Sequence, residues 1–154
     1  MRLYVIQHGE AASKEANPDR PLTDRGASDV QRLAVFLAKR GIGAARIVHS
    51  GKTRAKQTAD IIAAAAEPGV TPEVVDGLNP TDSVERMGTR IVEWTKETMI
   101  VGHQPFLGKL VARLLCADEN GASVAFLPGT AVCLERSDDG TWSLAWMLPP
   151  PLVR

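Results

Sequence analysis

Three polar segments of this chain each follow a short apolar run directly, and they carry the side chains best suited to chemistry. The segments are Gln7-His8-Gly9 after residues 3–6, His49-Ser50 after residues 46–48, and Gly102-His103 after residues 99–101. The carboxyl ends of parallel strands meet at one edge of a sheet, so these residues predict an active-site rim there. Gly9, which lacks a side chain, would let the backbone approach a bound group closely.

His8, Arg54 and His103 are the residues that we expect to react, and the chemistry that suits them is phosphoryl transfer. That reaction requires a nucleophile and cations that stabilise oxyanion charge. The imidazole of His8 can attack phosphorus and carry the phosphoryl group transiently. Arg54 begins a predicted helix, so its guanidinium and the helix N-terminus can both face a phosphate. His103 precedes another predicted helix, and as an imidazolium it would stabilise the equatorial oxygens.

Strand and helix patterns alternate along the chain that must position these residues. Strands are predicted at residues 3–7, 46–49, 73–75 and 98–101, and helices at about 24–40 and 53–66. Thr23 should cap the first helix, Thr81 or Asp82 should cap a third helix that carries Trp94, and Pro105 should open a fourth. Residues 131–135 and 142–147 read as an antiparallel hairpin, and residues 149–151 as an extended tail.

These elements predict an α/β fold in one domain spanning residues 1–154. The sheet should be mostly parallel and covered by helices on both faces, which makes a three-layer α/β/α sandwich. The antiparallel hairpin should form one edge of the sheet. A chain of 154 residues is long enough to bury a core of this kind.

Composition restricts the classes of partner. Eighteen basic residues balance eighteen acidic ones, so no bulk charge recruits nucleic acid or an anionic membrane. The opening apolar run of four residues is too short for a signal peptide, and no stretch approaches the roughly 20 apolar residues that span a bilayer. Cys116 and Cys133 match no metal or redox spacing. We therefore expect a cytoplasmic protein that uses no cofactor and no metal.

Four segments together resemble the histidine phosphatase superfamily, which has the phosphoglycerate-mutase-like fold. They are residues 7–11 (QHGEA), 20–26 (RPLTDRG), 49–58 (HSGKTRAKQT) and 101–105 (VGHQP), in order and in register. The resemblance is strongest to the short SixA-type phosphohistidine phosphatase branch. It implies that His8 is phosphorylated, that Arg54 grips the phosphate, that His103 is the second catalytic histidine, and that Arg20 matches a basic position of the family.

The resemblance also implies a substrate class and a set of contacts. The expected function is a phosphatase that acts on phosphohistidine of a protein, through a phosphohistidine enzyme intermediate. The partner would be a phosphorylated protein of the histidine-phosphotransfer type or a small phosphorylated molecule, and a phosphate or sulfate ion could occupy the site. Gln7, Gly9 and Arg20 are the expected substrate-binding residues.

Position 7 departs from the family pattern, which has arginine where this chain has Gln7. A guanidinium offers a fixed charge and paired donors, whereas an amide offers two neutral donors. Losing the charge from such hydrogen bonds costs roughly 1–2 kcal/mol. The rate would fall on the order of tenfold unless another cation compensates. Arg20 and Lys52 are the nearby candidates in the sequence.

A general acid is also missing from its expected place. Family members that cleave phosphate esters have a carboxylic acid after the third strand, where this chain has Asn79. Asp76, Asp82 or Glu85 could substitute for it. A phosphohistidine substrate removes the need, because neutral imidazole leaves far more readily than an alkoxide.

Other readings of the same residues remain open at this point. The chain could bind phosphate or phosphohistidine without useful turnover, because of Gln7. His8, His49 and His103 could form a metal site, although their spacing matches no zinc motif. Arg54 could be a solvated helix residue that pairs with Asp24 or Asp60, and His8 and His103 could be structural. For His49 a structural role is the favoured reading, and Arg20 could be a surface charge on a loop.

Overall fold

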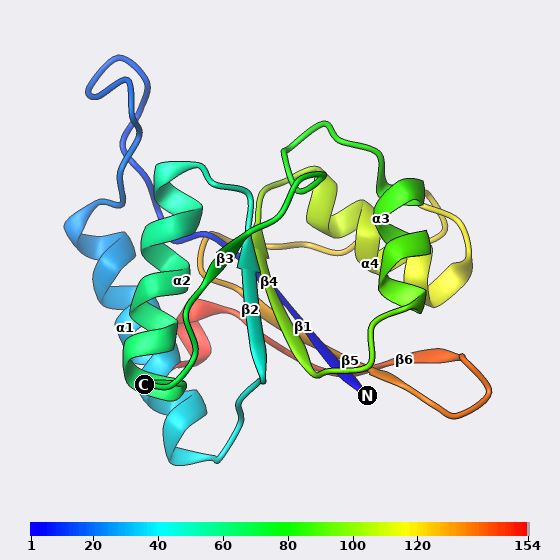
Figure 1. Ribbon diagram of the computed structural model, residues 1–154. Coiled ribbons are helices and arrows are strands. Elements are labelled where there is room, and N and C mark those ends of the chain that lie inside the picture. The colour runs from blue at the N-terminus through cyan, green and yellow to red at the C-terminus, as the bar shows by residue number, and fades with distance from the viewer. Residues whose placement is uncertain (154) are drawn as a thin grey trace.

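A six-stranded mixed sheet forms the centre of the computed structural model, which describes residues 1–153 (Figure 1). Its strands are β1 (Arg2–Gln7), β2 (Arg46–His49), β3 (Glu73–Val74), β4 (Thr98–Gly102), β5 (Ala131–Arg136) and β6 (Trp142–Leu148). They lie in the order β3-β2-β4-β1-β5-β6. The pairs β2/β3, β2/β4 and β1/β4 are parallel, whereas β5 runs antiparallel to both β1 and β6. The predicted parallel sheet with an antiparallel hairpin at its edge is confirmed.

Helices cover both faces of this sheet. The helices are α1 (Asp24–Lys39), α2 (Thr53–Ala66), α3 (Val84–Val92) and α4 (Phe106–Cys116). Figure 1 shows α1 and α2 on one side of the sheet, with α3 and α4 on the other. The fold is therefore the predicted three-layer α/β/α sandwich.

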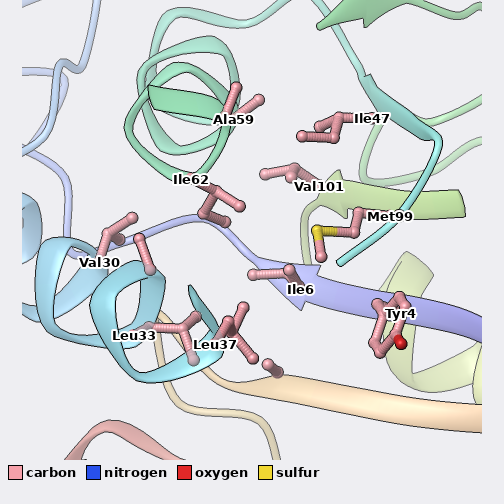
Figure 2. Packing of buried hydrophobic residues seen from close by; sticks show 14 of the residues in the cluster. Tyr4, Ile6, Val30, Leu33, Leu37, Ile47, Ala59, Ile62, Met99 and Val101 are labelled. Carbon is pink, nitrogen blue, oxygen red and sulfur yellow. The ribbon is translucent and has the colours of Figure 1, made fainter. Parts of the chain in front are cut away.

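Alternation along the strands divides the core between the two faces, because successive side chains of a strand point in opposite directions. Tyr4 and Ile6 of β1 pack with Leu33 and Ile62 of α1 and α2 (Figure 2). Leu3 and Val5 of the same strand belong to the cluster under α3 and α4. Each face of the central strands is thus covered by its own pair of helices, and only the ends of these strands are left uncovered.

Three local predictions are wrong. The third helix is capped by Ser83, whose Oγ accepts a hydrogen bond from a first-turn amide, and not by Thr81 or Asp82. It ends at Val92, so Trp94 lies beyond the helix. The C-terminal prolines are not an extended tail, because Pro150–Leu152 forms a short 3-10 helix. Proline fixes φ near the value that such a turn requires, which explains why the helix begins there.

The described helices also bear on membrane association. Within residues 1–153, none of them combines the length and the apolar character needed to cross a bilayer.

Candidate active site

The carboxyl ends of β1, β2 and β4 bring the predicted residues to one place. Gln7 of β1 lies opposite Gly102 of β4 in parallel register, and the amide of His8 donates a hydrogen bond to the Gly102 carbonyl at 3.0 Å. His103 directly follows the end of β4. The ring centroids of His8 and His103 are therefore only 5.1 Å apart.

The imidazole of His8 is held in one tautomer. Its Nδ1 lies 2.7 Å from the carbonyl oxygen of Gly9, which can only accept, so Nδ1 carries the proton. Its Nε2 accepts a hydrogen bond from Nε of Arg54 at 3.3 Å. Burial lowers the pKa of His8 to about 4, and the charges of Arg54 and Arg20 act in the same direction. His8 is therefore neutral at pH 7, and the lone pair of its Nε2 can attack an electrophile once the hydrogen bond from Arg54 is released.

Arg54 lies in the first turn of α2, beside the helix N-cap Lys52. Within residues 1–153 no carboxylate lies within salt-bridge distance of its guanidinium, and Asp60 pairs with Lys56 instead at 2.6 Å. Burial and the charge of Arg20 both lower the pKa of Arg54. The alternative in which Arg54 pairs with Asp24 or Asp60 at the surface is therefore not seen among the described residues, and its guanidinium contacts His8.

His103 is almost wholly buried, with 1% of its surface exposed. Its Nε2 lies 2.6 Å from Oγ of Ser50, whereas its Nδ1 is buried without a hydrogen-bond partner in the described part of the chain. Burial, followed by the charges of His8, Arg54, Lys52 and Arg20, lowers the pKa of His103 to about 3. Low polarity and nearby cations therefore favour the neutral ring of His103.

Packing inside the protein gives one reason for glycine at position 9. The amide of Gly9 donates to Oγ1 of Thr58 at 3.1 Å. A Cβ added at this position would lie 2.8 Å from the carbonyl oxygen of Gly26 and 2.8 Å from Cγ2 of Val30. The missing side chain therefore allows the close approach of α1.

The amide of Gln7 lies next to His8 and is largely buried, with 8% of the residue exposed. Its backbone N–H is satisfied by the carbonyl of Thr130 at 3.0 Å. Its side-chain Oε1 is buried without a hydrogen-bond partner among residues 1–153. Position 7 therefore brings a neutral amide with an unused acceptor to the edge of the site.

Arg20 lies on the loop between β1 and α1 and is half-buried. Its Nε donates to the carbonyl of Ala12 at 3.1 Å. Its charge lowers the pKa of His8, Arg54 and His103. Arg20 thus lies close enough for its charge to affect all three residues.

His49 lies outside this cluster of functional side chains. The residue is 2% exposed, and its Nδ1 accepts a hydrogen bond from the amide of Gly51 at 3.0 Å. Within residues 1–153 no three His, Cys, Asp or Glu side chains lie close enough together to hold a metal ion. His49 shapes the turn between β2 and α2.

Two of the three carboxylates that could act as a general acid bind other groups, and none of the three contributes to the pKa shifts of the site residues. Glu85 binds Arg113 at 2.6 Å, and Oδ2 of Asp82 accepts from the amide of Asn79 at 2.8 Å. The charged groups that shift the pKa of the site residues are cations and histidine, and none of them is Asp76 or another carboxylate. The cluster is suited to an anion.

Two residues of the site were given no individual role from the sequence. Ser50 directly follows β2, so the strand-end position that singled out the histidines also marked this serine. Thr58 lies one helical turn after Arg54, and its Oγ1 donates to the Arg54 carbonyl at 2.8 Å while it accepts from Gly9. Its spacing of four residues from Arg54 along α2 was the only sequence feature that could have identified Thr58.

Comparisons with known proteins agree with this geometry. The sequence model of the histidine phosphatase superfamily (branch 1) matches residues 3–97. An uncharacterized protein of Picosynechococcus sp. is 37% identical over 116 residues, which covers 71% of this chain and 70% of that protein. Phosphohistidine phosphatase SixA of Escherichia coli (strain K12) is 27% identical over 155 residues, 97% of this chain and 94% of that one. The protein histidine phosphatase SixA complexed with tungstate superposes over the full length of both chains with a TM-score of 0.89 and 23% identity, a likeness of fold.

Proposed function

Since the chain belongs to branch 1 of the histidine phosphatase superfamily, we propose that it removes phosphoryl groups from phosphohistidine of a protein substrate, with His8 as the transient carrier. One observation carries the proposal. The neutral His8 ring presents the lone pair of Nε2 beside Arg54, 3.3 Å from its Nε, while Nδ1 is fixed by a backbone carbonyl. This is the state that a nucleophile of phosphorus must have.

The first step transfers the phosphoryl group to the protein. The Nε2 of His8 forms a bond to phosphorus as the P–N bond of the substrate breaks, and that electron pair returns to the substrate ring. When the other nitrogen of that ring bears a proton, the ring leaves as neutral imidazole. Arg54 and the backbone amides at the start of α2 stabilise the oxygens of the phosphoryl group.

The second step restores the enzyme. A water oxygen bonds to phosphorus as the bond to Nε2 of His8 breaks, and the water proton leaves with the phosphate or with solvent. The approach of a phosphate dianion favours a charged ring at His103. The charged ring of His103 would then donate a hydrogen bond to the phosphoryl oxygens. The neutral ring would stabilise these oxygens less strongly.

The engagement of Glu85 and Asp82 with other groups supports phosphohistidine over phosphate esters. Among the described residues, the carboxylates after β3 do not shift the pKa of His8, Arg54 or His103. An alkoxide leaving group would need a proton, a contribution typically worth about 100-fold or more. The relative in Escherichia coli carries the name of a phosphohistidine phosphatase, which points the same way.

The test is brief incubation with a peptide that carries isotopically labelled phosphohistidine, followed by mass mapping. Acid-labile label is expected on His8 in the native protein and is expected to be absent in His8→Ala. In steady state, the phosphohistidine peptide should be hydrolysed faster than a sugar phosphate or an alkyl phosphate. Label on another residue would overturn the role of His8, and a preference for the ester would overturn the substrate class.

The buried, unpartnered Oε1 of Gln7 favours one second candidate, a protein that binds phosphohistidine or phosphate with little turnover. An amide cannot neutralise the charge that develops on the phosphoryl oxygens as a guanidinium can. Gln7→Arg distinguishes the two functions. A large gain from a nearly inert parent would support the binding protein, and ready turnover by the parent would exclude it.

A further inference from the structure

We propose that Arg20, on the loop between β1 and α1, provides the second guanidinium for the phosphoryl group and so replaces the charge that Gln7 does not supply. The inference rests on the proposed function for its ligand, a phosphoryl group. The effects of substitutions at positions 7 and 20 on ligand binding should therefore depend on each other.

The backbone of the loop places Arg20 at the loop's base rather than at its tip. The amide of Ala12 donates to the carbonyl of Pro21 at 2.8 Å, and Ala11 and Leu22 form an antiparallel bridge. These contacts close the loop immediately beside Arg20. A residue at the closed base of a loop is far less free to move away than one at an exposed tip.

The same base is tied to the helix that carries Arg54. The amide of Leu22 donates to Oε1 of Gln57 at 2.8 Å. Gln57 and Arg54 are three residues apart in α2 and therefore lie on neighbouring positions of one helix face. Figure 1 shows the loop after β1 rising beside α2 and α1. Arg20, two residues before Leu22, is thus held near the N-terminus of α2.

The side chain of Arg20 is oriented but not neutralised. Its backbone has φ of +48°, in the left-handed region, which a residue without special need avoids at a cost on the order of 1 kcal/mol. Its Nε donates to the Ala12 carbonyl at 3.1 Å, which fixes the plane of the guanidinium. Within residues 1–153, no carboxylate lies within salt-bridge distance of it. The two terminal amino groups remain available as a pair of donors for an oxyanion.

Two unpaired guanidinium groups near one nucleophile indicate an anion-binding site. Arg20 lowers the pKa of Arg54, because the two cations repel each other. No carboxylate among the groups that act on Arg54 or His103 relieves that repulsion. A phosphoryl group between them would relieve it, and Gln7, a neutral amide, adds no competing charge there.

The experiment is a double-mutant cycle at positions 7 and 20. The four proteins are the native chain, Arg20→Gln, Gln7→Arg and the double variant. Two quantities are measured in each protein, the Kd for tungstate by calorimetry and kcat/KM for a phosphohistidine peptide. Lys14→Gln, on the same loop and exposed, removes one charge as a matched control. Arg20→Lys keeps the charge and removes the planar pair of donors.

Arg20→Gln is expected to weaken tungstate binding at least tenfold and to lower kcat/KM by a similar or larger factor. In the Gln7→Arg background the same change should cost no more than about threefold, because the second guanidinium is already present. Arg20→Lys should fall between the native chain and Arg20→Gln. Lys14→Gln should match the native chain.

Equal losses in both backgrounds would overturn the proposal, as would an Arg20→Gln loss no larger than that of Lys14→Gln, or no tungstate binding by the native chain. If Arg20→Gln fails to fold, the comparison of Arg20→Lys in the two backgrounds decides the question. Tungstate binding does not require turnover. A native chain that binds tungstate through Arg20 but does not hydrolyse phosphohistidine would therefore sink the proposed function alone.

Discussion

The Nε of Arg54 donates a hydrogen bond to Nε2 of His8 across 3.3 Å, so the guanidinium touches the atom that we expect to attack phosphorus. The contact joins the end of β1 to the start of α2. It keeps the lone pair of Nε2 directed toward the cation that would bind the incoming oxygens. The nucleophile and the cation that would bind the phosphoryl oxygens therefore already lie together in the folded protein.

Replacing Arg54 by alanine should lower kcat/KM for a phosphohistidine peptide about 100- to 1000-fold, the typical effect of losing one preorganised oxyanion contact. Arg54→Lys should recover only part of the loss, since an ammonium group cannot donate to His8 and to two oxygens in one plane. Steady-state kinetics on both variants checks this. Activity within threefold of native for Arg54→Ala would remove Arg54 from the reaction.

Replacing Ser50 by alanine leaves Nε2 of His103 buried without its 2.6 Å partner. We expect a fall in kcat on the order of tenfold with little change in KM, because an orphaned buried group costs about 1–3 kcal/mol. Ser50→Thr, which keeps the hydroxyl, is the control. Nitrogen NMR of the His103 ring should show a mixture of tautomers in Ser50→Ala only, and an unchanged ring would argue against a positioning role.

The variants Asp76→Asn, Asp82→Asn and Glu85→Gln should each hydrolyse the phosphohistidine peptide within about twofold of the native rate. Glu85 is bound to Arg113, and none of the three shifts the pKa of the site residues. A general acid would contribute about 100-fold or more. A tenfold loss in any one of them would identify an acid that the proposed mechanism does not use.

Adding a methyl group at Gly9 should destabilise the fold by about 1–3 kcal/mol, the usual cost of overpacking. The new Cβ would lie 2.8 Å from a backbone oxygen of Gly26, which cannot rotate away. Gly69→Ala, where no atom lies within 4 Å of the new Cβ, is the matched control. Urea denaturation measures both, and equal midpoints would contradict the packing role.

Acid should destabilise the ligand-free protein between about pH 6.5 and pH 4. The pKa of His8 is lowered to about 4 and that of His103 to about 3, whereas both are near 6.5 in the unfolded chain. In this window the unfolded state binds more protons than the folded state, so stability falls as the pH falls. His8→Gln should show a shallower pH dependence of the unfolding free energy. An identical slope would mean that the His8 ring is not desolvated.

Much of the fold could be predicted because the secondary structure that the local sequence favours is also the one found in the folded chain. Thr23 caps α1, as its position before an amphipathic stretch predicted, and it accepts from the Gly26 amide at 3.0 Å. The cap of α3 was misplaced because Thr81, Asp82 and Ser83 are three adjacent residues that can all accept such a bond. The amide of Asn79 engages Asp82 and leaves the role to Ser83, a choice made by the loop and not by propensity.

The amino-acid sequence by itself determined the order of the strands and helices, the polar residues that follow the strands, and the departure at Gln7. These are properties of neighbouring residues, and periodicity and composition record them. Only the tertiary structure decided that burial favours the neutral ring of His103, that Ser50 is its partner, that Gly9 accommodates α1, and that the charge of Arg20 acts on Arg54. Each of these depends on burial and on contacts between residues far apart in the chain, and a linear sequence does not specify the dielectric or the distances that set them.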